Sequence, residues 1–184
     1  GSTDNTKEIV DKFKRENKIN IRYIYKKNEG KYKAINNAID LANGELFFIV
    51  DSDDTLTSTA IDVIKEYYIQ IEDKEDFIGV VGLRGNSELK AYTGYLNEKD
   101  SYNKCYDLEY IDATFIEYRY KYKISGDRAE VCITNKLKQF KFPENTEKFM
   151  SEGYLWNETS IKKMKFRYFN KVIYITEYLE DGLS

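Results

Sequence analysis

The stretch Leu46-Phe47-Phe48-Ile49-Val50 is a continuous apolar run, and it is followed directly by Asp51-Ser52-Asp53-Asp54. A short apolar run without polar alternation is typical of a parallel strand that is buried on both faces. In open α/β sheets, ligands bind beyond the carboxyl ends of such strands. The sequence therefore predicts that three carboxylates stand at a ligand-binding edge of a sheet.

Helical and strand patterns alternate on both sides of this run. Before it, the sequence predicts a helix over Thr6–Arg15, a strand over Ile19–Tyr25 and a helix over Tyr32–Ala42. After it, the pattern predicts a helix over Ser58–Ile71 and a strand over Phe77–Leu83. This alternation favours an α/β domain with an open, mostly parallel sheet flanked by helices.

The second part of the chain is less regular. Residues 84–104 are polar and loop-like, and the tyrosine-rich stretch 106–124 fits a helix and a strand equally well. A short helix is expected over Thr134–Phe140 and a late strand over Val172–Tyr178. We therefore expect a single domain, 1–184, in which a regular half, 1–83, is covered by a less regular half, 84–184.

The composition excludes several kinds of catalytic site and partner. The 184 residues include no histidine, so the chain has no Ser-His-Asp triad and no histidine base. A net charge of −3 without a basic cluster argues against a nucleic-acid partner. No apolar run reaches the roughly 18–20 residues that span a bilayer. Cys105 and Cys132 are expected to be free thiols in a reducing cytoplasm.

The acidic cluster after the apolar run indicates a metal site. Asp51 and Asp53 stand at alternate positions, so both side chains can point toward one ligand. Carboxylate oxygens suit Mg²⁺ or Mn²⁺, and these cations bind phosphate oxygens in turn. The alternative is an acidic turn that caps the next helix without a ligand.

Three segments resemble the motifs of family 2 glycosyltransferases with the GT-A fold. Gly1-Ser2-Thr3-Asp4-Asn5-Thr6 is similar to the family's G-S-x-D-x-T segment. Asn28-Glu29-Gly30-Lys31, with Ala34 and Asn36, resembles its N-x-G-K-x-x-A-x-N stretch. The residues from Ala42 to Asp54 are similar to the approach to its D-x-D motif. The resemblance covers residues 1–83 and implies that this half binds a nucleotide-sugar, with the acceptor on the side of residues 84–184.

The resemblance also implies roles for individual residues on the donor side. It assigns Asp51 to the ribose region of the nucleotide and Asp53 to an Mn²⁺ or Mg²⁺ ion, with Asp51 next to the same ion. Asp54 is expected to assist, and Asn28 and Lys31 occupy positions that face the nucleotide. The favoured donor is a UDP-sugar.

The catalytic base of inverting members is a carboxylate, often the Asp of an E-D pair before apolar residues. The segment Glu152–Asn157 resembles that region, but Gly153 replaces the Asp. Glu152 is therefore the first candidate for the general base, and Asp181, in a second acidic cluster, is the alternative. The candidate residues on the acceptor side are Asp127, Arg128 and Trp156.

The family normally has a strand, a helix and a second strand before G-S-x-D, a unit of roughly 30 residues or more. The printed sequence begins at that motif, so we expect it to represent a partial domain that lacks some nucleotide contacts. The resemblance implies metal-dependent, inverting transfer to a saccharide or glycolipid acceptor in polysaccharide or glycolipid biosynthesis. The expected location is the cytoplasm, and contact with the inner face of the membrane stays open.

Two other functions fit parts of the sequence. In a haloacid-dehalogenase-type phosphohydrolase, an apolar strand precedes D-x-D-x-T, with Asp51 as nucleophile and Asp53 as acid/base. That fold normally carries the motif on its first strand, whereas a helix, a strand and a helix are expected before it here. A non-catalytic remnant that binds a nucleotide-sugar is the second alternative, and Gly153 favours it.

Overall fold

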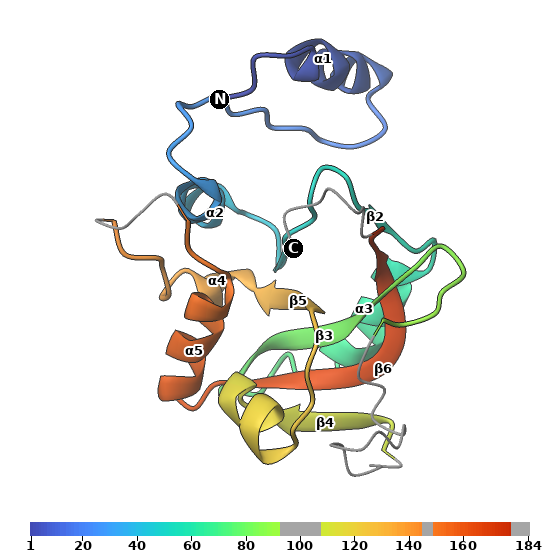
Figure 1. Cartoon of the computed structure of the whole chain (residues 1–184), viewed down its shortest axis with the longest axis vertical. Coiled ribbons are helices and arrows are strands. Elements are labelled where there is room, and N and C mark those ends of the chain that lie inside the picture. Colours follow the sequence, from blue (N-terminus) through green and yellow to red (C-terminus); the bar gives the residue numbers. More distant parts are fainter. Residues whose placement is uncertain (93–107, 145–148, 178–184) are drawn as a thin grey trace.

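The computed structural model describes residues 1–92, 108–144 and 149–177. Within these ranges, six strands form one sheet in the order β1-β5-β3-β6-β2, and β4 also pairs with β6 (Figure 1). The strands are β1 (Leu46–Phe48), β2 (Thr55–Leu56), β3 (Phe77–Gly85), β4 (Tyr110–Ala113), β5 (Arg128–Ile133) and β6 (Lys165–Ile175).

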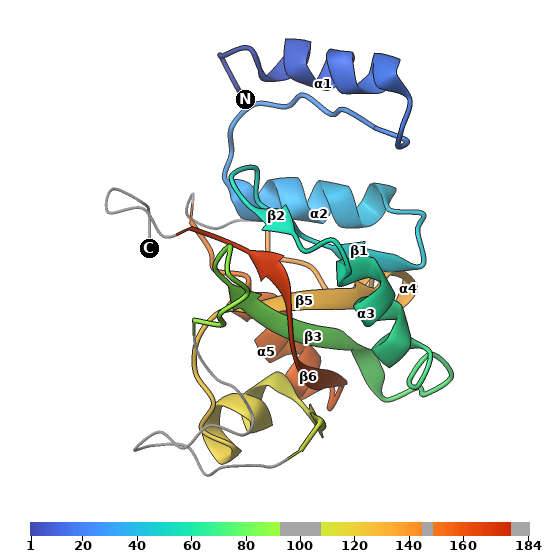
Figure 2. The ribbon, with the colours of Figure 1, turned by 90° about the vertical axis from the view of Figure 1, so that its right-hand side faces the viewer.

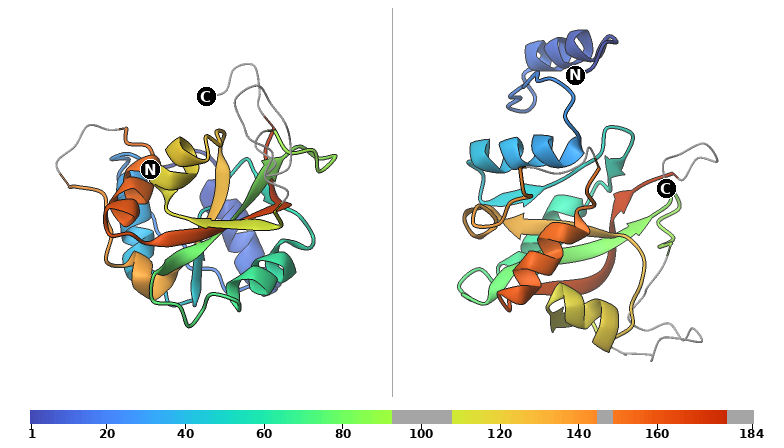
Figure 3. Two further views of the ribbon diagram at one scale, coloured as in Figure 1. Left: turned by 90° about the horizontal axis from the view of Figure 1, so that it is seen from below. Right: turned by 60° about the vertical axis from the view of Figure 1, so that its left-hand side comes forward.

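Helices pack on both faces of this sheet (Figure 3). The clusters of buried side chains place α2 and α5 on one face and α3 on the other. Gly79 allows β3 and β5 to approach, because a Cβ there would lie 2.0 Å from the Val131 carbonyl oxygen. The helices are α1 (Thr6–Glu16), α2 (Lys31–Leu41), α3 (Ala60–Tyr68), the π-helix η1 (Glu117–Lys121), α4 (Thr134–Leu137) and α5 (Gly153–Ile161).

The sheet is an α/β sheet of mixed direction. Strands β1, β3 and β6 run the same way, since β1 and β3 are each antiparallel to β5, and β3 is parallel to β6. The predicted α/β class is confirmed. Among the described ladders, β3–β6 is the parallel pair, because β5 lies antiparallel between β1 and β3. The prediction that the apolar run from Leu46 is a parallel strand buried on both faces is wrong, since β1 pairs antiparallel with β5 and is only partly buried.

The N-terminal segment stands apart from the sheet (Figure 2). The predicted first helix is confirmed as α1, but it buries none of its residues. The predicted strand over Ile19–Tyr25 is wrong, because these residues form no strand, and Ile19 and Tyr25 are 70% and 63% exposed. A strand needs a neighbour for its backbone hydrogen bonds, and no described strand pairs with this segment.

The second half is more regular than the sequence indicates. In the described part of the tyrosine-rich stretch, β4 is followed by η1. The helix expected over Thr134–Phe140 ends at Leu137, and the late strand begins at Lys165 instead of Val172. Strand β5 and helix α5 were not predicted. The residues of β5 and α5 pack against elements that are distant in the sequence, so the hydrophobic periodicity of each segment does not predict its secondary structure.

Two expectations from composition can be compared with the structure. Cys132 is a free, buried cysteine, whereas Cys105 lies outside the described residues. Across residues 1–92, 108–144 and 149–177, none of the helices combines the length and apolar character that a membrane crossing requires.

Candidate active site

The ammonium group of Lys31 connects two carboxylates at the carboxyl end of β1. Its Nζ lies 2.6 Å from Asp51 Oδ1 and 2.8 Å from Glu152 Oε1. The three side chains are between 32% and 52% exposed to solvent, so a ligand from solution can reach the cluster. The structure therefore brings together three residues that the sequence nominated separately.

Each member of this cluster is held at the end of an element. Lys31 is the first residue of α2, and Glu152 directly precedes α5. Gly30 enters α2 with a φ of 102°, a conformation that favours glycine, and Asn28 Oδ1 accepts a hydrogen bond from its amide at 3.2 Å. Asn28 thus shapes the turn that presents Lys31, and its predicted contact with the nucleotide stays a prediction.

A second set of contacts fixes α2 relative to α5. The Asn36 side chain donates to the Phe142 carbonyl at 2.9 Å and accepts from the Phe142 amide at 3.0 Å. The Phe142 ring packs against Tyr32 on α2 and against Tyr154 on α5, with centroids 5.8 and 6.0 Å apart. This bridge explains how Lys31 and Glu152 meet although 120 residues separate them, and it gives Asn36 a structural role.

The acidic loop after β1 holds its three carboxylates in different environments. Asp51 faces Lys31, and Asp54 Oδ2 accepts a hydrogen bond from the Tyr174 hydroxyl at 2.7 Å. Asp53 is exposed and makes no hydrogen bond or ion pair with the described part of the chain. Asp53 is therefore the carboxylate of the loop that is available to a ligand, whereas Asp54 anchors the loop.

The charge of Lys31 is stabilised by its partners. Burial alone would lower the pKa of the Lys31 ammonium, but the hydrogen bonds to Asp51 and Glu152 outweigh it and raise that pKa above its usual value. Lys31 therefore stays charged and neutralises part of the negative charge that the two carboxylates bring together.

A divalent cation is compatible with this loop if the donor completes its coordination. No group of three or more acidic or cysteine side chains within the described ranges could hold a metal ion alone. Mg²⁺, however, is commonly bound by one or two carboxylates together with substrate phosphates and water. The exposed Asp53 and the neighbouring Asp51 supply such a set, so these residues fit the predicted cation.

The residues predicted on the acceptor side have different surroundings. Asp127 lies exposed in the turn before β5. Arg128 is buried and donates to the Tyr118 hydroxyl at 3.0 Å and to the Ser125 carbonyl at 3.1 Å. Trp156 is 4% exposed and packs edge-on against Phe166. Arg128 and Trp156 thus have structural partners within the fold, because β5 and α5 turn them inward, and their predicted contact with the acceptor stays a prediction. Asp181 lies outside the described residues.

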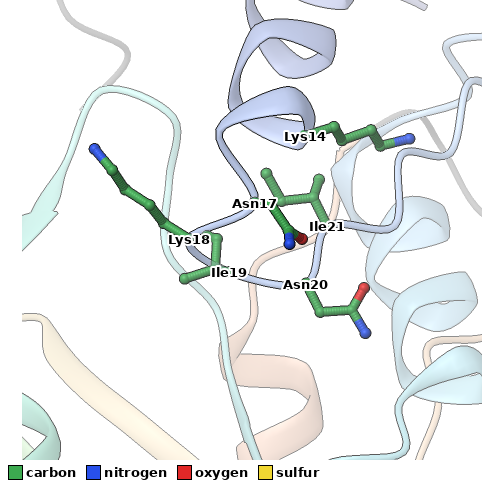
Figure 4. Close-up of a pocket in the computed structure, with 6 residues that line it drawn as sticks. All are labelled: Lys14, Asn17, Lys18, Ile19, Asn20 and Ile21. Carbon is green, nitrogen blue, oxygen red and sulfur yellow. The ribbon is translucent and has the colours of Figure 1, made fainter.

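A surface pocket lies away from this cluster, on the N-terminal segment (Figure 4). It is formed by the turn that follows α1, and its walls come from one short stretch of chain. None of the residues nominated for donor binding lines it, so it does not mark the donor site. Its lining residues are Lys14, Asn17, Lys18, Ile19, Asn20 and Ile21.

Three residues near this edge of the sheet were not found from the sequence. Tyr174 bonds to the acidic loop, Arg84 Cζ stacks 4.3 Å from the Tyr174 ring centroid, and Glu130 is partly buried on β5. Tyr174 is one of 17 tyrosines, and no local pattern distinguishes it from the others. Its role depends on β6 lying beside the loop, which is a tertiary feature.

Glu130 gives the protein a pH-dependent stability. Burial raises the pKa of its carboxyl to about 7, although the nearby Arg84, Arg119 and Arg128 oppose this rise. The folded state therefore binds the proton more tightly than the unfolded chain, and this contribution to stability is lost as pH rises from 4.5 to about 7. The full pKa shift would be worth about 3 kcal/mol in the free energy of unfolding. Glu130 keeps partial exposure, so its actual contribution is smaller than this.

We expect the Glu130→Gln variant to be more stable than the wild type above neutral pH and nearly equal to it in acid. Urea unfolding at about pH 5 and about pH 8 measures this difference. Glu88→Gln, at an exposed position, is the control and should show no such pH-dependent gain. Parallel pH profiles for the wild type and Glu130→Gln would contradict the prediction.

Comparison with known proteins identifies a family and a fold for this chain. The family model described as "Glycosyl transferase family 2" matches residues 1–141. The crystal structure of S. aureus TarS 1–349 in complex with UDP-GlcNAc has a TM-score of 0.63, with 18% identity over 98% of this chain and 48% of that chain. The crystal structure of S. aureus TarS has a TM-score of 0.62, with 18% identity over 97% of this chain and 30% of that chain.

One curated relative matches a shorter segment. An uncharacterized glycosyltransferase of Mycoplasma pneumoniae, the MG060 homolog, is 42% identical over 59 residues. That match covers 30% of this chain and 19% of the relative, and the chain likewise spans less than half of TarS 1–349.

The sheet, its helices and the acidic loop define a domain of the GT-A class. The chain belongs to glycosyltransferase family 2. This membership contradicts the haloacid-dehalogenase alternative and accounts for the three motifs in the first half of the sequence.

Proposed function

We propose that this chain transfers a sugar from a nucleotide-sugar donor, preferably a UDP-sugar, to an acceptor hydroxyl with inversion at the anomeric carbon. The observation that carries the proposal is the pair of Lys31 ion pairs, which sets Asp51 of the acidic loop near Glu152, the candidate base. The crystal structures of TarS with UDP-GlcNAc and with UDP support the choice of donor.

The proposed reaction uses Glu152 as general base. Its carboxylate accepts the proton of the acceptor hydroxyl, and the hydroxyl oxygen forms a bond to the anomeric carbon. The bond from that carbon to the diphosphate oxygen breaks on the opposite side, and the nucleoside diphosphate leaves with the electron pair. Lys31 fixes Glu152 relative to the acidic loop, so the general base is held in a set position relative to a donor bound at that loop.

Asp53 and Asp51 are the residues that would hold Mn²⁺ or Mg²⁺. When bound, the cation supplies neutralisation of the negative charge on the leaving diphosphate. The acceptor is proposed to be a saccharide or a glycolipid, approaching from the side of residues 84–184, where Asp127 is exposed.

Calorimetric titration of UDP into the chain, with and without Mn²⁺, tests this proposal. We expect saturable binding that requires the metal and disappears in Asp53→Asn, because the amide is a poorer ligand for a hard cation. The matched control is Asp62→Asn, which removes an exposed carboxylate on α3, away from the loop, and should bind like the wild type.

The outcomes separate the remaining alternatives. Binding that is equal without Mn²⁺, or retained in Asp53→Asn, would overturn the metal assignment. No binding of UDP, GDP or CDP under any condition would overturn the donor assignment for this chain. Metal-dependent binding without transfer from any nucleotide-sugar would select the non-catalytic remnant.

A further inference from the structure

We propose that Tyr174, on β6, is a positioning residue that clamps the acidic loop and presents Asp53 to the donor and its metal. This inference rests on the proposed function for its consequence, but the clamp itself is a property of the chain alone. The Tyr174 side chain is fully buried, so its hydroxyl position is set by the core.

The hydroxyl contacts both ends of the four-residue acidic stretch. It accepts a hydrogen bond from the Asp51 amide at 2.9 Å and donates one to Asp54 Oδ2 at 2.7 Å. A backbone hydrogen bond from the Asp54 amide to the Asp51 carbonyl, at 3.2 Å, closes the turn between them. A single tyrosine oxygen thus joins the first and last residues of the turn, and Asp53 projects from it.

The same strand also holds the chain that follows the turn. Residues Thr55 and Leu56 form β2, which pairs with Ile175 and Tyr174 of β6. The Thr57 amide then donates to the Ile173 carbonyl at 3.1 Å. The Tyr174 side chain therefore holds the acidic stretch itself, and backbone hydrogen bonds to β6 hold the residues that follow it. Of these attachments, the hydroxyl is the one that a point substitution can remove cleanly.

Packing keeps the Tyr174 ring in place. The Arg84 guanidinium lies over one face of the ring, and its Nε is fixed by the Arg128 carbonyl at 2.8 Å. The Phe48 ring from β1 packs 5.9 Å away, centroid to centroid.

The clamp matters for function because a loop that is already ordered loses less conformational freedom when a ligand binds. Without the hydroxyl, the Asp51 amide and the Asp54 carboxylate lose their shared partner, and the turn must be ordered by the metal and the donor instead. The expected consequence is weaker binding of UDP with Mn²⁺, with little effect on the rest of the fold.

The experiment compares Tyr174→Phe with Tyr168→Phe, a matched control on the same strand. The Tyr168 hydroxyl is also buried, but it has no hydrogen-bond partner among the described residues, and its ring stacks on Tyr118 on the other face of the sheet. Amide hydrogen exchange is measured by mass spectrometry on the ligand-free chains. We expect faster exchange in peptides that cover residues 49–56 of Tyr174→Phe, and no change there in Tyr168→Phe.

Calorimetry on the same variants gives the functional readout. Tyr174→Phe should bind UDP with Mn²⁺ about tenfold more weakly, the effect typical of losing a hydrogen bond to a charged group, whereas Tyr168→Phe should match the wild type. Unchanged exchange over residues 49–56, or equal effects in both variants, would overturn the clamp. A wild-type chain that does not bind UDP would instead count against the proposed function, and the exchange result would still decide the clamp.

Discussion

Replacing Glu152 with Gln is expected to lower turnover by at least about 100-fold while leaving the affinity for UDP and Mn²⁺ nearly unchanged. Glutamine has the same shape, and its amide oxygen can still accept a hydrogen bond from Lys31, which lies 2.8 Å from the present carboxylate. It cannot take a proton from the acceptor hydroxyl. The loss should therefore fall on the chemical step and not on the binding of the donor.

Steady-state kinetics with a saturating donor, together with calorimetry, measures the two quantities separately. Glu158→Gln is the control, because this residue lies on the same helix α5, about one and two-thirds turns beyond Glu152. Among the described residues, the ion pairs of Lys31 are with Asp51 and Glu152 and not with Glu158. Near-wild-type turnover in Glu152→Gln would show that another group is the base. Asp181, the alternative from the sequence, would then be the residue whose Asn variant loses turnover.

The largest effect on stability is expected at Asp112, which pairs with a buried arginine. Arg167 is 3% exposed, and its Nε and Nη2 donate to the two carboxylate oxygens of Asp112 at 2.8 and 2.7 Å. Its Nη1 donates to Gln70, and its guanidinium stacks on Tyr110. Asp112→Ala leaves this cation desolvated without its counter-ion, so we expect a loss of about 3 kcal/mol in the free energy of unfolding.

Urea unfolding at neutral pH measures this loss. Glu66→Ala is the control, since it removes the partner of Lys171 from an ion pair in which both side chains are more than 40% exposed. Exposed pairs contribute about 1 kcal/mol or less, so the control should change little. The double variant Asp112→Ala/Arg167→Leu should recover part of the loss. Equal losses in the two single variants would contradict the expectation that burial makes the difference.

The expectations that succeeded concern residues close together in the sequence. The apolar run from Leu46 predicted a strand followed by an acidic loop, and the structure has β1 and that loop in these positions, although β1 is antiparallel to β5 and only partly buried. The helical periodicity from Tyr32 predicted α2, whose inward residues Tyr32, Ile35 and Ile39 are buried. Such elements can be predicted because the residues of a buried face recur at a regular spacing along the sequence.

The expectations that failed concern pairing with distant partners. Residues Ile19–Tyr25 have high strand propensity, yet they form no strand, because propensity for a strand is realised only against a neighbour. Strand β6 begins seven residues earlier than predicted, since its first part is stabilised by β3 and β4.

The sequence by itself determined that carboxylates follow a strand, that a helix begins beside Lys31, and that the motifs are those of glycosyltransferase family 2. Only the tertiary structure decided that Glu152 meets Lys31 and Asp51, and that Tyr174 holds a loop 123 positions earlier in the chain. The physical reason is the range of the interactions. Hydrophobic periodicity is written in neighbouring residues, whereas ion pairs and hydrogen bonds between distant segments depend on the order of the strands and the packing of the helices on them.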